Sequence, residues 1–117
     1  MNTLAEAEDL WETVRRIKQF TDERRNLPQD MTLLLRLAKM QEELGELSQA
    51  LIGAKGWNPR KGISHTQEDV LKETCDVILT AMVTLVTLTD DPGQAFDEHL
   101  DHIERRWKDH LRAEPGR

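Results

Sequence analysis

Apolar residues recur at intervals of three and four positions along most of the chain, which is the spacing of one face of an α-helix. Short groups of turn-forming residues interrupt this pattern. It predicts four helices, over residues 4–21, 31–52, 66–89 and 92–113. Strand-favouring residues gather only at 77–88, inside one of these segments, so the predicted class is all-α. We expect an antiparallel helical bundle of about four helices, forming one domain over residues 1–113 with a flexible tail at 114–117.

Local signals predict where the helices end. Polar residues 22–30 include Pro28 and are expected to separate the first two helices. Asp30 or Thr32 is the expected N-cap of the second helix, and residues 53–62 form the loop that follows it. The third helix opens with a sequence typical of a capping box, in which the pair is Thr66 with Asp69 or Ser64 with Gln67.

The third predicted helix is apolar around nearly its whole circumference, except for one polar stripe. At about 100° per residue, this stripe spans roughly 80° and consists of Glu73, Asp76, Thr80, Thr84 and Thr87. A helix of this kind is buried, and carboxylates on it must be paired or must bind a metal ion. Cys75 is accordingly expected to be a small buried apolar residue. Because one short chain cannot cover so much apolar surface, we expect a homodimer or homotetramer.

The second predicted helix has a core face and an acidic face. Glu42, Glu43 and Glu46 fall within roughly 100° of one another on the acidic face. Like charges at this spacing repel, so the five carboxylates of the two helices are either solvated or offset by cations. Salt bridges to basic residues are the simpler explanation for Glu73 and Asp76. The second helix, however, adds further carboxylates and not cations, and we therefore expect a divalent cation shared by both helices. Gly45 lies among these acids, and a close approach of another backbone would explain it.

The candidate ligands are carboxylates alone, a set that suits Mg²⁺, Mn²⁺ or Ca²⁺. The Glu-x-x-His pattern of di-iron bundles is absent, because Gln49 and Asp76 stand three positions after Glu46 and Glu73. Carboxylate-held Mg²⁺ usually keeps open positions for water and for substrate phosphates. The residues therefore indicate a divalent metal and a phosphate-containing substrate.

Glu-Glu-x-x-Glu at 42–46, followed by Glu-x-x-Asp at 73–76, resembles the signature of the MazG-like all-α nucleoside triphosphate pyrophosphohydrolases. The resemblance covers mainly residues 33–88. It implies hydrolysis of a nucleoside or deoxynucleoside triphosphate to the monophosphate and pyrophosphate, as in housecleaning of the nucleotide pool. It also implies that Mg²⁺, or Mn²⁺ in its place, is held by Glu43, Glu46, Glu73 and Asp76. Glu42 would be a further ligand or an outer carboxylate, and Glu46 or Glu43 would be the general base.

Six residues are candidate contacts for the substrate: Lys39, Trp57, Asn58, Arg60, Lys61 and Thr80. Trp57 can stack on a base, and Arg60 and Lys61 can neutralise phosphate oxygens. The alternative for this loop is an ordinary basic turn in which Trp57 covers the core. Lys39 has a comparable alternative as the i,i+4 partner of Glu43.

Charge and cysteine content narrow the possible partners. A formal charge of −6 argues against polymeric nucleic acid or an anionic membrane, but permits a nucleotide neutralised by metal ions. Cys75 is the only cysteine, which excludes an intrachain disulfide. Because the first residues lack the features of a signal peptide, we expect a cytoplasmic protein. The alternatives to an NTP pyrophosphohydrolase are a structural helical oligomer, a non-catalytic divalent-metal-binding module and a phosphoribosyl-ATP hydrolase.

Overall fold

The computed structural model describes residues 4–113, with side chains described from residue 9 to residue 112. The described residues form four α-helices and no strand: α1 (Leu4–Arg25), α2 (Gln29–Lys55), α3 (Gln67–Leu88) and α4 (Pro92–Ala113). The predicted all-α class is confirmed for this part of the chain. The tail predicted at 114–117 lies outside it.

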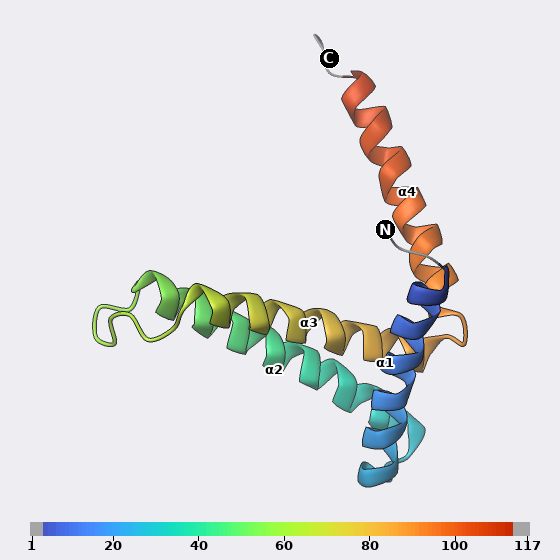
Figure 1. Cartoon of the computed structure of the whole chain (residues 1–117), viewed down its shortest axis with the longest axis horizontal. Coiled ribbons are helices and arrows are strands. Elements are labelled where there is room, and N and C mark those ends of the chain that lie inside the picture. Colours follow the sequence, from blue (N-terminus) through green and yellow to red (C-terminus); the bar gives the residue numbers. More distant parts are fainter. Residues whose placement is uncertain (1–3, 114–117) are drawn as a thin grey trace.

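α2 and α3 form a long antiparallel hairpin and share the most extensive contact between any two helices (Figure 1). α1 crosses this hairpin near the C-terminal end of α3. α4 meets α1 near its own N-terminus and then extends away from the hairpin, so that the molecule is V-shaped (Figure 1). Four helices are present as predicted, but only α2 and α3 run side by side along their length.

α1 continues to Arg25 instead of ending at Thr21, and the predicted polar break shrinks to residues 26–28. The polar residues at the end of α1 stay helical because Asp22 forms ion pairs within α1 and with α2. Asp22 accepts a hydrogen bond from Lys18 Nζ at 3.0 Å and a second one from Arg36 of α2. The break was therefore misplaced because Asp22 joins two helices instead of facing solvent.

The ends of α2 also differ from the prediction. Pro28 occupies the N-cap position without a side-chain hydrogen bond, so neither Asp30 nor Thr32 is the cap. Its φ of −56° and ψ of 152° are those of an extended residue before a helix. Thr32 Oγ1 instead donates to the carbonyl of Pro28 at 3.1 Å. At the other end α2 reaches Lys55, where Gly56 adopts a left-handed φ of 66° and ends the helix.

The capping box of α3 is confirmed, with Thr66 and Asp69 as its pair. Thr66 Oγ1 accepts the Asp69 backbone N–H at 3.1 Å, and the Asp69 carboxylate accepts the Thr66 backbone N–H at 2.9 Å. The hydrogen bond from the Thr66 backbone lowers the pKa of Asp69. The alternative pair, Ser64 with Gln67, is not used because Thr66 is the N-cap.

The core of the single chain is small. Val14 of α1 packs against Val83 and Val86 of α3, with Trp11, Ile17 and Met82 around them. The rest of α3 is not buried all round as predicted: Leu71 is 66% exposed and Ile78 is 55% exposed. Cys75, predicted to be buried, is exposed as well. The reason is that α2 and α1 cover only one side of α3, while α4 points away from it.

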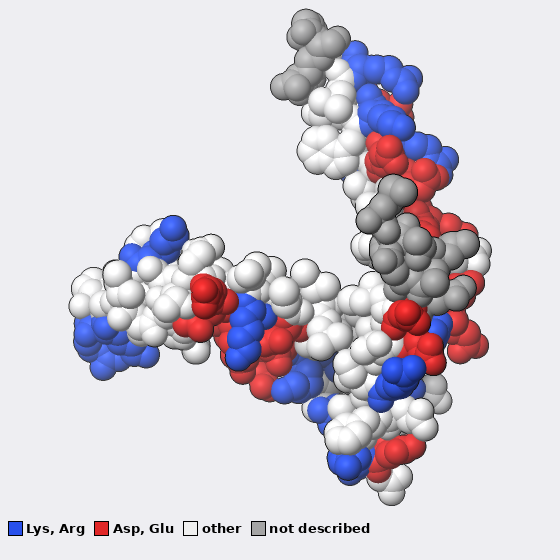
Figure 2. All heavy atoms as spheres, viewed as in Figure 1, with Lys and Arg blue, Asp and Glu red and all other residues white. Residues whose placement is uncertain are grey.

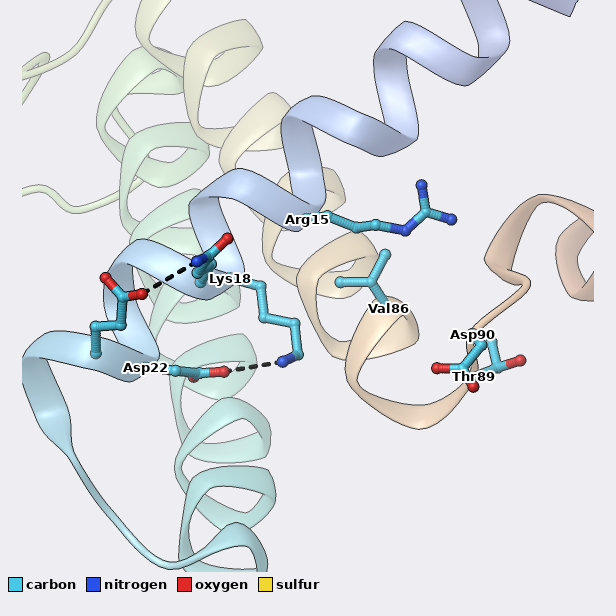
Figure 3. Close-up of a pocket in the computed structure, with 8 residues that line it drawn as sticks. Arg15, Lys18, Asp22, Val86, Thr89 and Asp90 are labelled. Carbon is cyan, nitrogen blue, oxygen red and sulfur yellow. Dashed lines mark hydrogen bonds and ion pairs between the residues drawn. The ribbon is translucent and has the colours of Figure 1, made fainter.

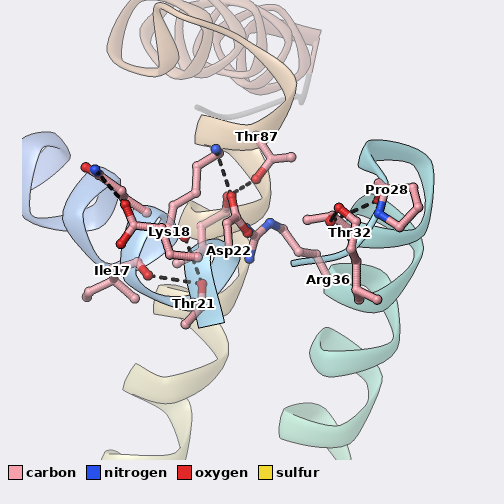
Figure 4. Close-up of polar contacts among 12 residues, drawn as sticks. Ile17, Lys18, Thr21, Asp22, Pro28, Thr32, Arg36 and Thr87 are labelled. Atoms are coloured by element: carbon pink, nitrogen blue, oxygen red, sulfur yellow. Dashed lines mark hydrogen bonds and ion pairs between the residues drawn. The ribbon is translucent and has the colours of Figure 1, made fainter. Parts of the chain in front are cut away.

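A polar contact ties α1 to α2 at the junction of the V. Figure 4 shows Arg36 of α2 and Lys18 of α1 meeting at the carboxylate of Asp22. The Arg36 side chain is only 4% exposed, and its Nε atom has no hydrogen-bond partner among the described residues. Beside this contact, a hollow of about 480 Å³ lies between α1 and the end of α3 (Figure 3). Because Lys18 is already paired with Asp22, we assign this hollow no ligand.

Replacing Gly53 and Gly45 by alanine is expected to change stability in opposite directions. At Gly53 the new Cβ would lie 2.3 Å from Nδ1 of His65 and 2.4 Å from Oγ of Ser64, so the loop must shift, at a cost of about 1–3 kcal/mol. At Gly45 no neighbouring segment lies within 4 Å of the new Cβ, and alanine favours a helix by about 1 kcal/mol. The close backbone approach predicted at Gly45 is therefore wrong. Urea unfolding of both variants checks the expectation, and a Gly45→Ala variant less stable than Gly53→Ala would contradict it.

Candidate metal centre

Three carboxylates converge between α2 and α3. Glu43 belongs to α2, whereas Glu73 and Asp76 stand three positions apart on α3 and share one face of it. Each residue is half-buried and offers one oxygen, and these three oxygens lie within 4.8 Å of one another. We call these residues the acidic triad. The antiparallel packing of the hairpin brings them together from distant parts of the sequence.

Two oxygens of the triad are buried without a partner. Oε2 of Glu43 and Oε2 of Glu73 are removed from solvent, and neither has a hydrogen bond to any described residue. A buried carboxylate oxygen in this condition has lost its hydration without replacement, which is costly. Acidic groups on an ordinary surface avoid this cost because water solvates them. These oxygens are therefore suited to a bound cation, and an all-oxygen set suits Mg²⁺, Mn²⁺ or Ca²⁺.

The electrostatics of the triad favour a cation in the same way. Burial raises the pKa of Glu43, and the negative charges of Glu46 and Asp76 raise it further. The positive charge of Lys39 lowers the pKa of Glu43, but by less than the other effects raise it, so the pKa is raised overall. The carboxylates around Glu43 thus carry more negative charge than neighbouring lysine can balance.

The other two predicted ligands lie outside the triad. Glu46 is exposed but close to Glu43, since both its charge and a hydrogen bond with it raise the pKa of Glu43. Glu42 is exposed and accepts a hydrogen bond from Lys39 Nζ at 2.9 Å. The ion pair predicted between Lys39 and Glu43 is therefore formed with Glu42 instead, at i,i+3 spacing. Lys39 stays near the site and is half-buried.

Thr80 lies one turn after Asp76 on the same face of α3. Its Oγ1 donates to the backbone carbonyl of Asp76 at 2.8 Å, and Thr84 Oγ1 donates to the carbonyl of Thr80 at 3.0 Å. The threonine stripe therefore satisfies its hydroxyl groups within its own helix. This explains how polar side chains can occupy the contact with α2, where Thr84 also reaches Met40 Sδ at 3.3 Å.

The predicted loop contacts lie at the free end of the hairpin, away from the triad (Figure 1). From Glu46 to Lys55, the helix rises by about 13 Å before the loop begins. Trp57 is 65% exposed, so it does not cover the core as the alternative prediction has it. The Asn58 side chain accepts the Arg60 backbone N–H at 3.2 Å, which folds the loop into a compact turn. Within one chain, the structure does not bring this loop to the triad.

The same loop forms a hollow of about 170 Å³ that sequence reasoning did not find. Asn58 and Lys61 line it together with Gly53, Ser64 and His65. Ser64 Oγ and His65 Nδ1 lie 2.9 Å apart, although the sequence indicates only helix capping for Ser64. The available signal was Gly53, because a glycine inside the last turns of a helix often marks a close approach.

Comparison of the chain with protein-family models, with curated proteins and with solved structures found no match. Among the described helices, none is both long enough and apolar enough to cross a membrane.

Proposed function

We propose that this protein is a metal-dependent nucleoside triphosphate pyrophosphohydrolase, which cleaves an NTP or dNTP to the monophosphate and pyrophosphate. The observation that carries the proposal is the pair of buried, unpartnered oxygens of Glu43 and Glu73 beside Asp76. The resemblance of the two acidic motifs to the MazG-like enzymes supplies the reaction and the position of cleavage.

In this proposal the acidic triad holds the metal, with Glu46 beside it and Glu42 as an outer carboxylate. Bound Mg²⁺ supplies charge stabilisation at the phosphate oxygens and a more acidic water molecule. The protein holds its ligands on two packed helices, so that their positions depend on the hairpin and not on a loop.

Glu46 is the better candidate for the general base. A base must reach the attacking water, and Glu46 is exposed next to Glu43. Glu43 is less suited because its Oε2 is buried and because one of its oxygens lies within 4.8 Å of oxygens of Glu73 and Asp76. Lys39 and Thr80 lie near the triad and are proposed to contact the phosphate part of the substrate. Residues 57–61 are proposed to contact the remainder, with the exposed Trp57 ring available for stacking on a base.

The test is incubation with a panel of ribo- and deoxynucleoside triphosphates and Mg²⁺ or Mn²⁺, measuring pyrophosphate and nucleoside monophosphate. We expect equal amounts of the two products from at least one nucleotide. Glu46→Gln is expected to lower the rate by about 10²–10⁴-fold, as loss of a general base does. Glu68→Gln, an exposed change in the first turn of α3, is the matched control and should leave the rate unchanged. Metal binding without pyrophosphate release from any nucleotide would instead indicate a non-catalytic metal-binding module.

A further inference from the structure

The single chain exposes much more surface than a compact protein of its size. Its accessible surface is 9312 Å² at a mass of 13.5 kDa, whereas a compact monomer of this mass exposes roughly 6,500 Å². Its radius of gyration is 18.3 Å, compared with about 13 Å for a compact domain. The excess is roughly 2,800 Å² per chain, or roughly 5,600 Å² for two chains, which is at the upper end of the total area that obligate homodimers bury.

Part of the exposed apolar surface is organised in two stripes, one on each arm of the V, and further exposed leucines lie on α2, namely Leu34, Leu37, Leu44 and Leu51. The stripe on α3 lies on the side away from the acidic triad and consists of the exposed Leu71, Cys75 and Ile78, followed by the half-buried Met82 and Leu85. Met82 also packs against the core of its own chain. The stripe on α4 consists of Phe96, Leu100, Ile103, Trp107 and Leu111. Both follow spacings of three and four residues, which is the pattern of helices that pack along their length. Trp107, the largest side chain of the α4 stripe, is 61% exposed.

The two stripes border one open notch. Figure 2 shows the side of α4 that faces the notch without Lys, Arg, Asp or Glu, while charged residues follow the opposite side. The edge of the hairpin that faces the notch, formed by α3, is also largely free of charge (Figures 1 and 2). Residues 77–88 of α3 carry no charged side chain at all. A notch with two apolar walls is a surface that must be covered.

The chain itself is not positioned to close this notch. Pro92 at the start of α4 is fully buried, and a Cβ on Gly93 would lie 3.4 Å from Nε1 of Trp11. The Gln94 backbone N–H also donates to Asp91 at 3.3 Å and caps the helix. Folding α4 back onto its own α3 would remove these packed residues from α1.

We infer that a second copy of this chain fills the notch, with the α4 stripe of each protomer packed against the α3 stripe of the other. In such a two-fold dimer the same contact is made twice, and both stripes of both chains are covered. The matched spacing of the two stripes and the excess accessible area favour a second copy as the occupant. The inference does not depend on the proposed hydrolysis, because the α3 stripe lies opposite the triad.

Cys75 gives a direct test because it is the only cysteine and lies within the α3 stripe. Leu100→Cys, Ile103→Cys and Trp107→Cys are made separately, each with Cys75 present and each with Cys75→Ser. Under mild oxidation, we expect at least one of the three to form a disulfide-linked dimer only when Cys75 is present. Dimers that persist with Cys75→Ser would place α4 against α4, and dimers of the unaltered chain would place α3 against α3. Either result, or no cross-link in any variant, would overturn the inference.

Light scattering after size-exclusion chromatography provides the independent readout. The unaltered chain should have twice the mass of one protomer. Trp107→Asp should weaken the dimer by about 100-fold or more, because it removes an aromatic anchor and places a charge in the contact. Arg105→Asp on the charged side of α4 is the matched control and should remain dimeric. Circular dichroism must show equal helix content in both variants, and a monomeric unaltered chain would contradict the inference.

Discussion

Replacing Glu43 by glutamine is expected to lower metal-dependent hydrolysis by about 100-fold or more, because the triad loses a charged ligand. The same change is expected to stabilise the metal-free protein at neutral pH. Burial and the charges of Glu46 and Asp76 raise the pKa of Glu43, so its ionised form is unfavourable in the folded state. Glutamine keeps the shape of the side chain without that charge.

The pH dependence follows from the direction of the shift. A carboxyl group whose pKa is raised on folding contributes stability at pH values below its pKa in the unfolded chain, which is about 4.5 for a glutamate. This contribution is lost as the pH rises through the raised pKa of the folded state. The metal-free protein should therefore lose stability over this interval, and Glu43→Gln should lose less. Mn²⁺ should restore stability to the unaltered protein at neutral pH and should have little effect on the variant.

Thermal unfolding from pH 4 to pH 8, with and without Mn²⁺, measures these effects together with the pyrophosphate assay. Glu68→Gln serves as the control, since it removes an exposed carboxylate of α3 that lies outside the triad. If Mn²⁺ stabilises Glu43→Gln as much as the unaltered protein, the triad is not the metal site.

Removing Asp22 is expected to destabilise the folded protein strongly, because it leaves the buried Arg36 without its partner. Breaking a buried ion pair costs about 3–5 kcal/mol, mainly because the remaining charge stays buried. Arg36 is 4% exposed, but Asp22 is 28% exposed, so we expect about 2 kcal/mol for Asp22→Ala after allowing for solvent screening. This corresponds to a fall in melting temperature of about 10 °C.

Two controls separate the buried charge from other effects of Asp22→Ala. Lys18→Ala removes the more exposed partner of Asp22 and should cost less than about 0.5 kcal/mol. Combining Asp22→Ala with Arg36→Met removes the isolated charge and should recover most of the lost stability. A double variant as unstable as Asp22→Ala would show that the contact matters for packing and not for charge.

The helices that the sequence predicts correctly are those defined by local signals. The capping box at Thr66 and the start of α4 at Pro92 depend on residues within one turn, and both are found as expected. The end of α1 could not be placed in this way, because Asp22 looks like a loop residue until Arg36 is beside it. Helical periodicity likewise shows that α3 is apolar except for one polar stripe, but it does not show that Leu71 and Ile78 stay exposed in the single chain.

The sequence predicts the chemistry of the candidate site better than it predicts which residues form the site. Helical spacing places Glu43 with Glu46, and Glu73 with Asp76, on one face of each helix. It cannot give the distance across two helices, which depends on how α2 and α3 pack. For the same reason it could not show that Lys39 pairs with Glu42 and that Trp57 lies at the far end of the hairpin.

The small core has a consequence for the order of folding. α2 and α3 are neighbours along the chain, so the hairpin closes over one short loop at a modest entropic cost. Val14, by contrast, is separated from Val83 and Val86 along the sequence by α2 and most of α3. It can contact them only when α1 packs against the C-terminal end of α3. Contacts of such long sequence separation form late. The hairpin, which carries the acidic triad, should therefore form before α1 packs against it and buries the three valines.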